Sequence, residues 1–565
     1  MASSATETTR VDAAGEGGPT GADALVAAFQ DLGVQTVFGL PGVHNLPVWE
    51  AAAAAGLRVV GVRHEQAAVY AADGYARATG RLGVAVVTTG PGAANTRGAT
   101  GEAMASGAPV LVVATDIPST LRRPGVHRGV LHETRDQAAM FAPVTKTTVV
   151  TPAAADLYAD TVRPGSAALR PATGPVYLGV PTDFLSAPAG SPERTPAPPV
   201  PERQVDGDEL ARARELIARA HRPLVWAGGG ALRSGAGELV GELAHRLAAP
   251  VVTTFGGRGL LPPDHPCLVP GPAHVPVIGR LWDEADLVVS LGSDLDGTST
   301  QNWAMPRPPA LLAVNVDPAD ATKNYPADVT VTGDVSAVLG ALLDGLPQRD
   351  GLPALQETLD TTAREVRALV HADEPQAEGL LDALDRVSDR TGVLLADMCI
   401  AGYWAAAFSR VPGPRRLAFP LGWGTLGYAF PAAIGAALAG RGRALALIGD
   451  GGFLFACGEL ATLVQEQLPV TTVLVDDGGY GMLRFDQVHS GVPTRGVDLA
   501  TPDFAALARS FGVPARAVDG FGEEFAAALS DSLDASGPDV LVVRAALTPP
   551  PSTSPRWYRR RQPAP

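Results

Sequence analysis

The chain alternates short apolar runs with longer segments in which apolar residues recur every three or four positions. From residue 34, the runs VQTVFGLP, RVVGV, VAVVTTGPG and PVLVVA are separated by LPVWEAAAAAG, by EQAAVYAADGYARATG and by a small-residue segment ending at Ser106. Continuous apolar runs are typical of strands buried on both faces, and the periodic segments are typical of helices. The pattern therefore predicts an α/β domain with a parallel sheet over residues 21–187.

The same alternation returns twice further along the chain. The runs RPLVWAGGG, VVTTF, ADLVVSLGSDL and ALLAVNVD predict a central α/β domain over residues 205–345. The runs GVLLADM, ALALIGDGG and PVTTVLVDDGG, with the helical patterns TLGYAFPAAIGAALA and GELATLVQEQ between them, predict a third over residues 377–547. The predicted fold class is therefore α/β, with three doubly wound parallel-sheet domains.

Segments of different composition separate and flank these domains. Closely spaced prolines remove amide donors and forbid helix, so residues 188–204 are predicted to be an exposed, semi-rigid linker. Residues 346–376 are predicted to form a mostly helical connection. Residues 1–20 are rich in Ala, Ser, Thr and Gly, and residues 548–565 contain PPPSTSPRWYRRRQPAP, so we expect a disordered N-terminus and a flexible tail.

Charge and cysteine content narrow the classes of partner and compartment. The chain carries 44 Lys and Arg residues against 59 Asp and Glu residues, and the net charge of −15 repels polyanions, which argues against a nucleic-acid partner. Cys267, Cys399 and Cys457 are scattered and odd in number, which indicates neither a disulfide framework nor a zinc site and is typical of a reducing cytoplasm. No stretch approaches the ~18 continuous apolar residues of a membrane span. We therefore expect a cytoplasmic protein without a membrane partner.

Two acidic loops follow apolar runs in the third domain. GDGG (449–452) follows ALALI, and DDGG (476–479) follows PVTTVLV. Since the carboxyl ends of parallel strands share one edge of a sheet, Asp450 and Asp477 can converge there. Two carboxylates, a backbone carbonyl, phosphate oxygens and water suit Mg²⁺, which prefers octahedral oxygen ligation. On the residues alone, the first loop is equally well explained as a tight connection, and the acidic pair is better explained as turn caps.

The spacing from GDG to this acidic pair, with the continuation GGYGM, resembles the cofactor motif of thiamine-diphosphate enzymes of the acetolactate synthase group. The resemblance implies that Asp450, Asp477 and the carbonyl of Gly479 ligate Mg²⁺. It also implies that the cofactor contacts the remaining residues of the loops, Gly451, Gly452, Tyr480, Gly481 and Met482. The family usually has two asparagines where this chain has two aspartates, and the added charge is expected to repel a diphosphate unless magnesium neutralises it.

A second match with the same family lies in the first domain. The segments RHEQAA (63–68), AADGYARATG and TTGPGAANT resemble the pyrimidine-binding domain of that family. The resemblance implies that Glu65 is catalytic, because it hydrogen-bonds N1′ of the aminopyrimidine and promotes the imino form that removes the thiazolium C2 proton. On the residues alone, Glu65 is a solvated acid at a helix start, where the macrodipole favours a negative charge.

A third match is GWGTLGY (422–428), followed by AFPAAIGAALA. The resemblance implies that Leu426 wedges between the two cofactor rings and bends the cofactor, and that the Gly424 carbonyl accepts a hydrogen bond from the 4′-amine. Bending makes the proton transfer intramolecular. On the residues alone, Leu426 is an ordinary core residue. In the family, Glu65 and Asp450 would act on one cofactor from different subunits, which implies a homodimer as the minimum active unit and is also compatible with a homotetramer.

Two loops of the first domain are candidates for the substrate site. FGLPGVHN contains Val43 and His44, and GVHRGVLHETRDQ contains His127 and His132. The segments LHETRDQ and VFGLPGVHN look more like the guanidino-oxopentanoate decarboxylase branch than like biosynthetic acetolactate synthases. A histidine can transfer protons because its pKa lies near neutrality. A lone histidine is nevertheless more often a structural hydrogen-bonder, and solvation of the second loop explains His132 equally well.

Together these matches predict Mg²⁺- and thiamine-diphosphate-dependent decarboxylation of a small 2-oxo acid, ending in release of an aldehyde or in carboligation to a second carbonyl compound. The alternative is a non-catalytic binding or regulatory protein that kept the fold, suggested by the acidic pair and by Val43. A dinucleotide-dependent oxidoreductase would rest on the GGG turn (228–230) alone. The segment ADLVVSLGSDLDG lacks the arginine-containing end of the family's flavin segment, so we expect no bound FAD.

Overall fold

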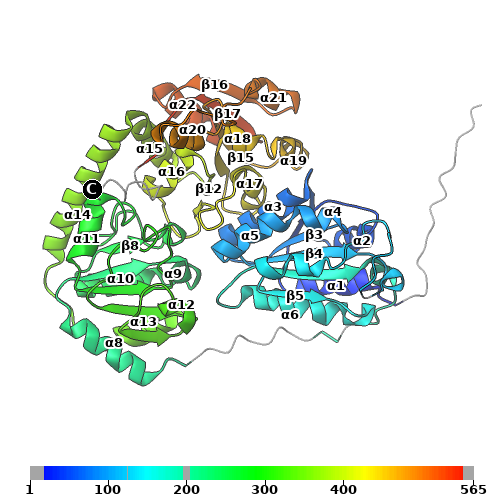
Figure 1. Ribbon diagram of the computed structural model, residues 1–565, viewed down its shortest axis with the longest axis horizontal. Helices are drawn as coiled ribbons and strands as arrows, with labels where there is room; N and C mark the ends of the chain where they lie inside the picture. Colours follow the sequence, from blue (N-terminus) through cyan, green and yellow to red (C-terminus); the bar gives the residue numbers. More distant parts are fainter. Residues whose placement is uncertain (1–17, 124, 192, 195–203, 551–565) are drawn as a thin grey trace, which may run out of the picture.

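The structure is a computed structural model in which three parallel sheets, each flanked by helices, follow one another along the chain (Figure 1). The described residues are 18–123, 125–191, 193–194 and 204–550. All pairings between the named strands of the three sheets are parallel. The predicted fold class of three parallel-sheet α/β domains is therefore confirmed.

The first sheet has the strand order β2-β1-β3-β4-β6-β5. Its strands are β1 (Thr36–Gly39), β2 (Arg58–Gly61), β3 (Gly83–Val87), β4 (Val110–Asp116), β5 (Thr147–Val150) and β6 (Val176–Pro181). Its helices are α1 (Gly21–Asp31), α2 (Leu46–Ala54), α3 (Glu65–Thr79), α4 (Pro91–Asn95), α5 (Arg97–Ser106), α6 (Leu157–Leu169) and α7 (Thr182–Ser186). Every residue of β1, β3, β4 and β6 is buried, because helices cover both faces of the sheet, and this burial explains the continuous apolar runs.

The second sheet has the order β11-β10-β9-β7-β8. Its strands are β7 (Pro223–Ala227), β8 (Val251–Thr253), β9 (Leu287–Leu291), β10 (Leu311–Asn315) and β11 (Val329–Thr332). The helices of this domain and of the following connection are α8 (Gly207–Arg219), α9 (Gly229–Arg233), α10 (Gly237–Leu247), α11 (Pro276–Glu284), α12 (Pro318–Thr322), α13 (Val335–Leu343), α14 (Leu352–Asp373) and α15 (Pro375–Val387). None of the helices in the described part of the chain combines the length and the apolar character that crossing a bilayer requires.

The third sheet repeats the strand order of the first when strands are counted from the start of each domain: β13-β12-β14-β15-β17-β16. Its strands are β12 (Val393–Ala396), β13 (Leu417–Ala418), β14 (Ala444–Gly449), β15 (Val470–Asp476), β16 (Ala515–Asp519) and β17 (Asp539–Arg544). Its helices are α16 (Ile400–Phe408), α17 (Ala429–Ala437), α18 (Asp450–Phe453), α19 (Leu460–Gln465), α20 (Gly481–His489), α21 (Phe504–Ser510) and α22 (Glu523–Leu533). The first and third domains are therefore two versions of one topology.

Helices α3 and α17 join the first and third domains and lie side by side (Figure 1). The two helices meet at glycines: a Cβ at Gly74 of α3 would collide with the carbonyl oxygen of Ala432, and one at Gly435 of α17 would collide with that of Ala71. Only residues without a side chain permit this approach of the two backbones. One hydrophobic core therefore runs through both domains, and the first domain is held against the loops of the third.

The chain ends and the Pro-rich linker are described only in part. The predicted disordered start, linker and flexible tail lie outside the described residues at 1–17, 195–203 and 551–565. Thr548, the first residue of the predicted tail, is held on both sides: its N–H donates to Glu374 at 2.8 Å, and its carbonyl accepts from the indole of Trp404 at 2.8 Å. The domain boundaries given above stay predictions.

Candidate active site

Two acidic loops meet at the carboxyl edge of the third sheet. Asp450 is the first residue of α18, directly after β14, and Asp477 directly follows the neighbouring strand β15. Asp450 is fully buried, its Oδ1 accepts from the Gly451 N–H at 2.7 Å, and its Oδ2 accepts from the Gly479 N–H at 2.8 Å. The carboxylate of Asp450 therefore ties the first loop to the second.

The charges in these loops fit a divalent cation. Burial, together with the carboxylates of Asp477 and Asp476, raises the pKa of Asp450 to about 7. Oδ1 of Asp477 is buried and has no hydrogen-bond partner among the described residues, an unfavourable state unless a cation lies against it. Within the described part, no three His, Cys, Asp or Glu side chains form a metal group. The two carboxylates and the backbone carbonyls of these loops are nevertheless oxygen ligands of the kind that Mg²⁺ prefers.

A pocket of about 120 Å³ opens beside the acidic loops. All of its lining residues lie between residues 397 and 547, in the third domain. The predicted cofactor-binding residues that line it are Leu426, Asp450, Gly451, Gly452, Asp477, Gly479, Tyr480, Gly481 and Met482. The structure thus brings together three segments that are far apart in sequence, while Glu65 and Gly424 are not among the residues that line this pocket.

Asp397 is a site residue that the sequence analysis missed. It follows β12, is 1% exposed, and accepts from the N–H groups of Met398 at 2.7 Å and of Gly427 at 3.0 Å. Burial raises the pKa of Asp397 to about 7. Its carboxylate holds residues 422–428, here called the Leu426 loop, against the pocket. The available signal was an acid at the end of the apolar run GVLLAD, the same signal that identified Asp450.

The first domain holds the same Leu426 loop from its other side. The hydroxyl groups of Tyr70 and Thr425 lie 2.6 Å apart, and the Tyr428 hydroxyl donates to Asp73 at 2.8 Å. Arg77 pairs with Asp73 at 2.7 Å and lies over the ring of Tyr428, 4.9 Å from its centroid. These buried contacts of α3 therefore fix where Leu426 stands relative to the pocket.

Glu102 of α5 is the second acid that pairs with Arg77, at 2.9 Å, and it predicts a specific pH dependence for the stability of the fold. Burial raises the pKa of Glu102 to about 7, although Arg77 opposes this shift. The pKa of Glu102 is therefore higher in the folded protein than its ordinary value. Its contribution to the free energy of unfolding is fully present below about pH 4.5 and is lost as the pH rises through about 7.

We therefore expect the thermal unfolding midpoint of the protein to fall between pH 4.5 and about 7 by more than that of Glu102→Gln, whose amide does not titrate. Differential scanning calorimetry at fixed ionic strength measures both slopes. Because the substitution also weakens the pair with Arg77, the comparison uses the slopes and not the absolute midpoints. Equal slopes in the two proteins would show that Glu102 keeps the same pKa on folding.

Glu65 lies at the carboxyl edge of the first sheet, as the first residue of α3 after β2. Its side chain is 9% exposed, and Oε2 accepts from Nδ2 of Asn95 at 3.0 Å. The next residues, Ala67, Ala68 and Val69, are buried and form an apolar surrounding. The structure therefore presents Glu65 as a mostly buried acid held by one amide.

The predicted substrate residues lie on loops at this same edge. His44 follows β1, and its Nδ1 lies 2.8 Å from the Thr89 hydroxyl; its ring is 5.5 Å from that of His132 in an edge-on arrangement. Burial lowers the pKa of His44, and His132 lowers it further. Val43 is 86% exposed, and His127 is half-exposed. The rings of His44 and His132 are therefore in contact, whereas the side chains of Val43 and His127 are exposed to solvent.

Comparison with known domain families covers most of the chain. Residues 19–140 match the thiamine pyrophosphate enzyme N-terminal TPP binding domain, residues 210–342 match the central domain, and residues 397–543 match the C-terminal TPP binding domain. The chain belongs to the thiamine pyrophosphate enzymes. The predicted resemblance is confirmed, and the two domains whose edges carry Glu65 and Asp450 are the two TPP binding domains.

Individual relatives of this thiamine-diphosphate enzyme fall into two groups by name. It is 37% identical to the probable 2-ketoarginine decarboxylase AruI of Pseudomonas aeruginosa, over 88% of this chain and 89% of that protein. It is 31% identical to the probable acetolactate synthase large subunit of Methanocaldococcus jannaschii, over 88% and 87% of the two chains. The acetolactate synthase of Mycobacterium bovis is 32% identical over 87% and 82%. The chain is therefore an enzyme of the decarboxylase and acetolactate synthase family.

The GGG turn of the central domain of this thiamine-diphosphate enzyme has a packing explanation. A Cβ at Gly228 would collide with the carbonyl oxygen of Gly292, and one at Gly230 would lie 2.8 Å from the Gly292 Cα. The glycines therefore let the start of α9 pack onto the turn after β9, a requirement that holds with or without a nucleotide. The absence of FAD stays a prediction.

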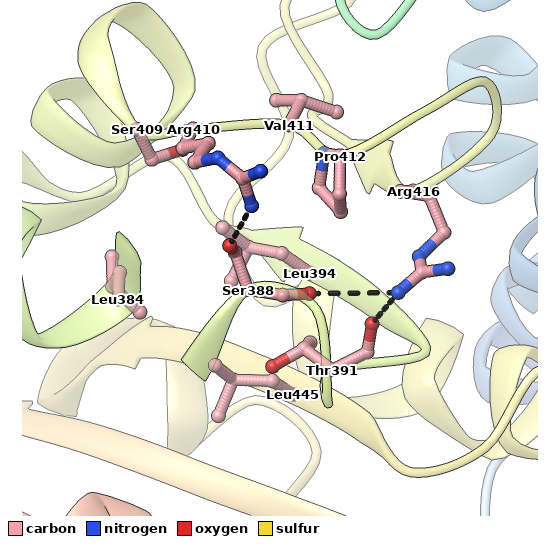
Figure 2. Close-up of a pocket in the computed structure, with 10 residues that line it drawn as sticks. All are labelled: Leu384, Ser388, Thr391, Leu394, Ser409, Arg410, Val411, Pro412, Arg416 and Leu445. Carbon is pink, nitrogen blue, oxygen red and sulfur yellow. Dashed lines mark hydrogen bonds between the residues drawn. The ribbon is translucent and has the colours of Figure 1, made fainter. Parts of the chain in front are cut away.

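A second hollow in the third domain of the enzyme, of about 20 Å³, contains none of the predicted site residues (Figure 2). Arg410 donates to the Ser388 hydroxyl at 2.9 Å, and Arg416 donates to the Thr391 carbonyl at 2.6 Å across it. Space of this size holds a water molecule and no organic ligand. The two arginines therefore hold the loops around β12 in place.

Proposed function

We propose that this enzyme binds thiamine diphosphate and Mg²⁺ in the pocket beside Leu426 and decarboxylates a 2-oxo acid. The observation that carries the proposal is that residues of three separate motif segments line this one pocket. Asp450, Asp477 and the Gly479 carbonyl would hold the metal, and through it the diphosphate, with the other residues of the two loops against the cofactor. When bound, the cofactor supplies a ring that accepts the electron pair released as carbon dioxide leaves.

The residues of the chain have distinct tasks in this proposal. Leu426 would lie against the cofactor rings and favour their bent shape, and the Gly424 carbonyl would accept a hydrogen bond from the 4′-amine. Glu65 holds a proton at N1′ of the aminopyrimidine. His44 and His132, whose rings lie edge-on to each other, would face the reacting carbons and move protons there, while Val43 and His127 would border the same space.

The active unit in this proposal is a homodimer, and a homotetramer built from such dimers is compatible with it. Glu65 does not line the pocket of its own chain, so a second chain would have to supply it. Large apolar side chains are exposed near both sheet edges, as expected for surfaces that a partner covers. They include Val43, Leu46 and Leu131 in the first domain and Phe455, Leu483 and Val488 in the third.

We propose that the substrate is a 2-oxo acid with a cationic side chain. Decarboxylation of this acid would give an aldehyde, which the enzyme would release as the product. The relative with 37% identity is named for 2-ketoarginine, and the LHETRDQ and VFGLPGVHN loops support the same branch. Carboligation of pyruvate is the second candidate, because the acetolactate synthases are 31% to 32% identical. A cytoplasmic location and the absence of nucleic-acid partners stay predictions from composition.

The substrate proposal is tested by comparing two 2-oxo acids side by side. Purified enzyme with thiamine diphosphate and Mg²⁺ is incubated with 5-guanidino-2-oxopentanoate or with pyruvate, and products are identified by mass spectrometry. We expect the guanidino acid to have the higher kcat/KM and to give the aldehyde shortened by one carbon. A higher kcat/KM for pyruvate, with acetolactate as the product, would assign the chain to carboligation instead. Cofactor uptake without turnover of either acid would favour the non-catalytic alternative.

A further inference from the structure

The turn that leads into Glu65 is attached to the third domain of the same chain. The end of β2 and the following turn contact α19, and we call this the β2–α19 contact. Arg58 pairs with Glu466 at 3.3 Å, and the Arg63 side chain donates to Gln465 at 2.8 Å. These side-chain contacts lie near the surface, where ion pairs and hydrogen bonds contribute little to stability.

Glu459, immediately before α19, makes the buried part of the β2–α19 contact. Its side chain is 1% exposed, and Oε1 accepts from the backbone N–H groups of Arg63 at 2.9 Å and of His64 at 3.1 Å. Its Oε2 accepts from the Thr462 hydroxyl at 2.6 Å. One carboxylate therefore satisfies the two peptide N–H groups that immediately precede Glu65 in sequence.

These two N–H groups lie immediately before the first residue of α3. His64 is the N-cap of the helix: it has extended backbone angles, its ring nitrogen accepts from the Gln66 N–H, and Glu65 is the first helical residue. Two hydrogen bonds from consecutive peptides to one oxygen fix the orientation of both peptide planes. The position of the Glu65 Cα, and so the reach of its carboxyl group, follows from that orientation.

The desolvation cost of burying Glu459 indicates that this residue contributes to the position of the backbone before Glu65 more than to stability. Burial raises the pKa of Glu459, against the three donors that lower it, so keeping a carboxylate here has a desolvation cost. The nearby Arg58–Glu466 pair already joins the same two elements without that cost. Among the described residues, Glu459 alone supplies an acceptor for the two N–H groups in front of Glu65. A shift of about 1 Å in a reacting group can slow a reaction by roughly a hundredfold.

We propose that Glu459 is a positioning residue for Glu65, holding the catalytic acid from the cofactor-binding domain of its own chain. The inference rests on the proposed role of Glu65 in thiamine-diphosphate catalysis. It also means that a single segment, from Asp450 at the metal site to Glu459 nine residues later, connects the acidic loops to the acid that serves the other subunit.

The test compares Glu459→Ala, Glu459→Gln and the control Glu466→Gln, which removes the surface ion pair of the same contact. Two readouts are used besides turnover: amide hydrogen exchange of the peptide containing Arg63 and His64 in the cofactor-free protein, and exchange of the cofactor C2 proton in the holoenzyme by NMR. For Glu459→Ala we expect faster amide exchange and a C2 exchange rate lowered roughly tenfold to a hundredfold. Calorimetric affinity for thiamine diphosphate with Mg²⁺ should stay within about threefold, because Asp450 and Asp477 are intact.

Glu459→Gln is expected to recover most of the C2 exchange rate. Its amide oxygen can accept from both peptide N–H groups, and its NH₂ can donate to the Thr462 hydroxyl, so the geometry survives without the charge. Should Glu459→Ala fail to fold, Glu459→Asp provides the same test, because it keeps the charge but withdraws the acceptor by one methylene.

The outcomes separate this inference from the proposed function. Wild-type C2 exchange in Glu459→Ala or Glu459→Asp would overturn the positioning role while leaving the proposed function intact. Equal losses of affinity, melting temperature and exchange rate in Glu459→Gln and Glu459→Ala would reduce Glu459 to a structural residue. If the wild-type holoenzyme itself exchanged C2 no faster than free cofactor, both the proposed function and the role of Glu459 would be refuted.

Discussion

Glu65→Gln is expected to lower turnover of the 2-oxo acid by a factor of about 10² to 10⁴, the usual contribution of one acid-base group, while thiamine diphosphate still binds. The amide has nearly the size of the carboxyl group and can still accept from Asn95, so the start of α3 is preserved. What it lacks is a proton that it can share with the ring nitrogen. Steady-state kinetics give the turnover number, and titration calorimetry with Mg²⁺ gives the cofactor affinity.

Glu50→Gln is the matched control for this experiment. Glu50 is an exposed acid of α2 in the same domain, and its substitution removes the same charge from a residue with no role in the proposed site. We expect its kinetics to equal those of the unaltered enzyme. Full turnover by Glu65→Gln would show that Glu65 is not the catalytic acid. Loss of cofactor binding in that variant would indicate that Glu65 also contributes to binding the aminopyrimidine ring.

The fold was predictable from the sequence because burial on both faces of a parallel sheet leaves a local signal. Strands β1, β14 and β15, which carry site loops, are mostly buried apolar runs with the loop directly after them, whereas the edge strand β2 before Glu65 is only partly buried. The same rule located Asp450 and Asp477 at one sheet edge. The structure adds that β14 and β15 are direct neighbours in parallel register, which brings the two loops together.

The residues that position the site were not predictable in the same way. Glu102 and Glu459 are buried acids whose partners lie in other segments, and the donors to Glu459 are 395 and 396 residues away in sequence. Within GELATLVQEQ, Glu459 has the appearance of a solvated acid on a helix. A single sequence does not distinguish an acid that faces water from one that faces another domain, since both occur at a polar position of a periodic pattern.

The two aspartates at 476 and 477, by contrast, were visible in the sequence, but their consequence depended on the structure. The structure leaves one oxygen of Asp477 buried without a hydrogen-bond donor among the described residues, next to the fully buried Asp450. Two buried carboxylates of this kind favour a cation between them over a neutral ligand. The departure from the usual asparagines therefore strengthens the case for a metal and does not weaken it.

Asp450→Asn is expected to lower the Mg²⁺-dependent affinity for thiamine diphosphate by roughly a hundredfold or more, since even groups one step removed from a metal contribute about 10- to 100-fold. The asparagine lacks the charge, and it cannot accept from both the Gly451 and Gly479 N–H groups on separate oxygens, so the tie between the two loops is lost as well. Calorimetry with and without EDTA measures the metal-dependent part.

Two further variants show whether the effect belongs to this position. Asp519→Asn removes an exposed acid at the end of β16 in the same sheet and should leave cofactor affinity unchanged. Asp477→Asn keeps an oxygen ligand and restores the residue usual in the family, so we expect a smaller loss than for Asp450→Asn. Wild-type affinity in Asp450→Asn would refute the metal site as assigned.

The same substitution also decides whether one active site draws on two chains. If Glu65 and Asp450 serve different sites, a dimer of one Glu65→Gln chain and one Asp450→Asn chain contains one site with both changes and one intact site. Random mixing places half of the chains in such dimers, so co-expression of two inactive variants should restore about a quarter of the wild-type activity. Each variant purified alone stays inactive and serves as its own control. If both residues served the site of their own chain, every site in the mixture would carry one change, and no activity would return.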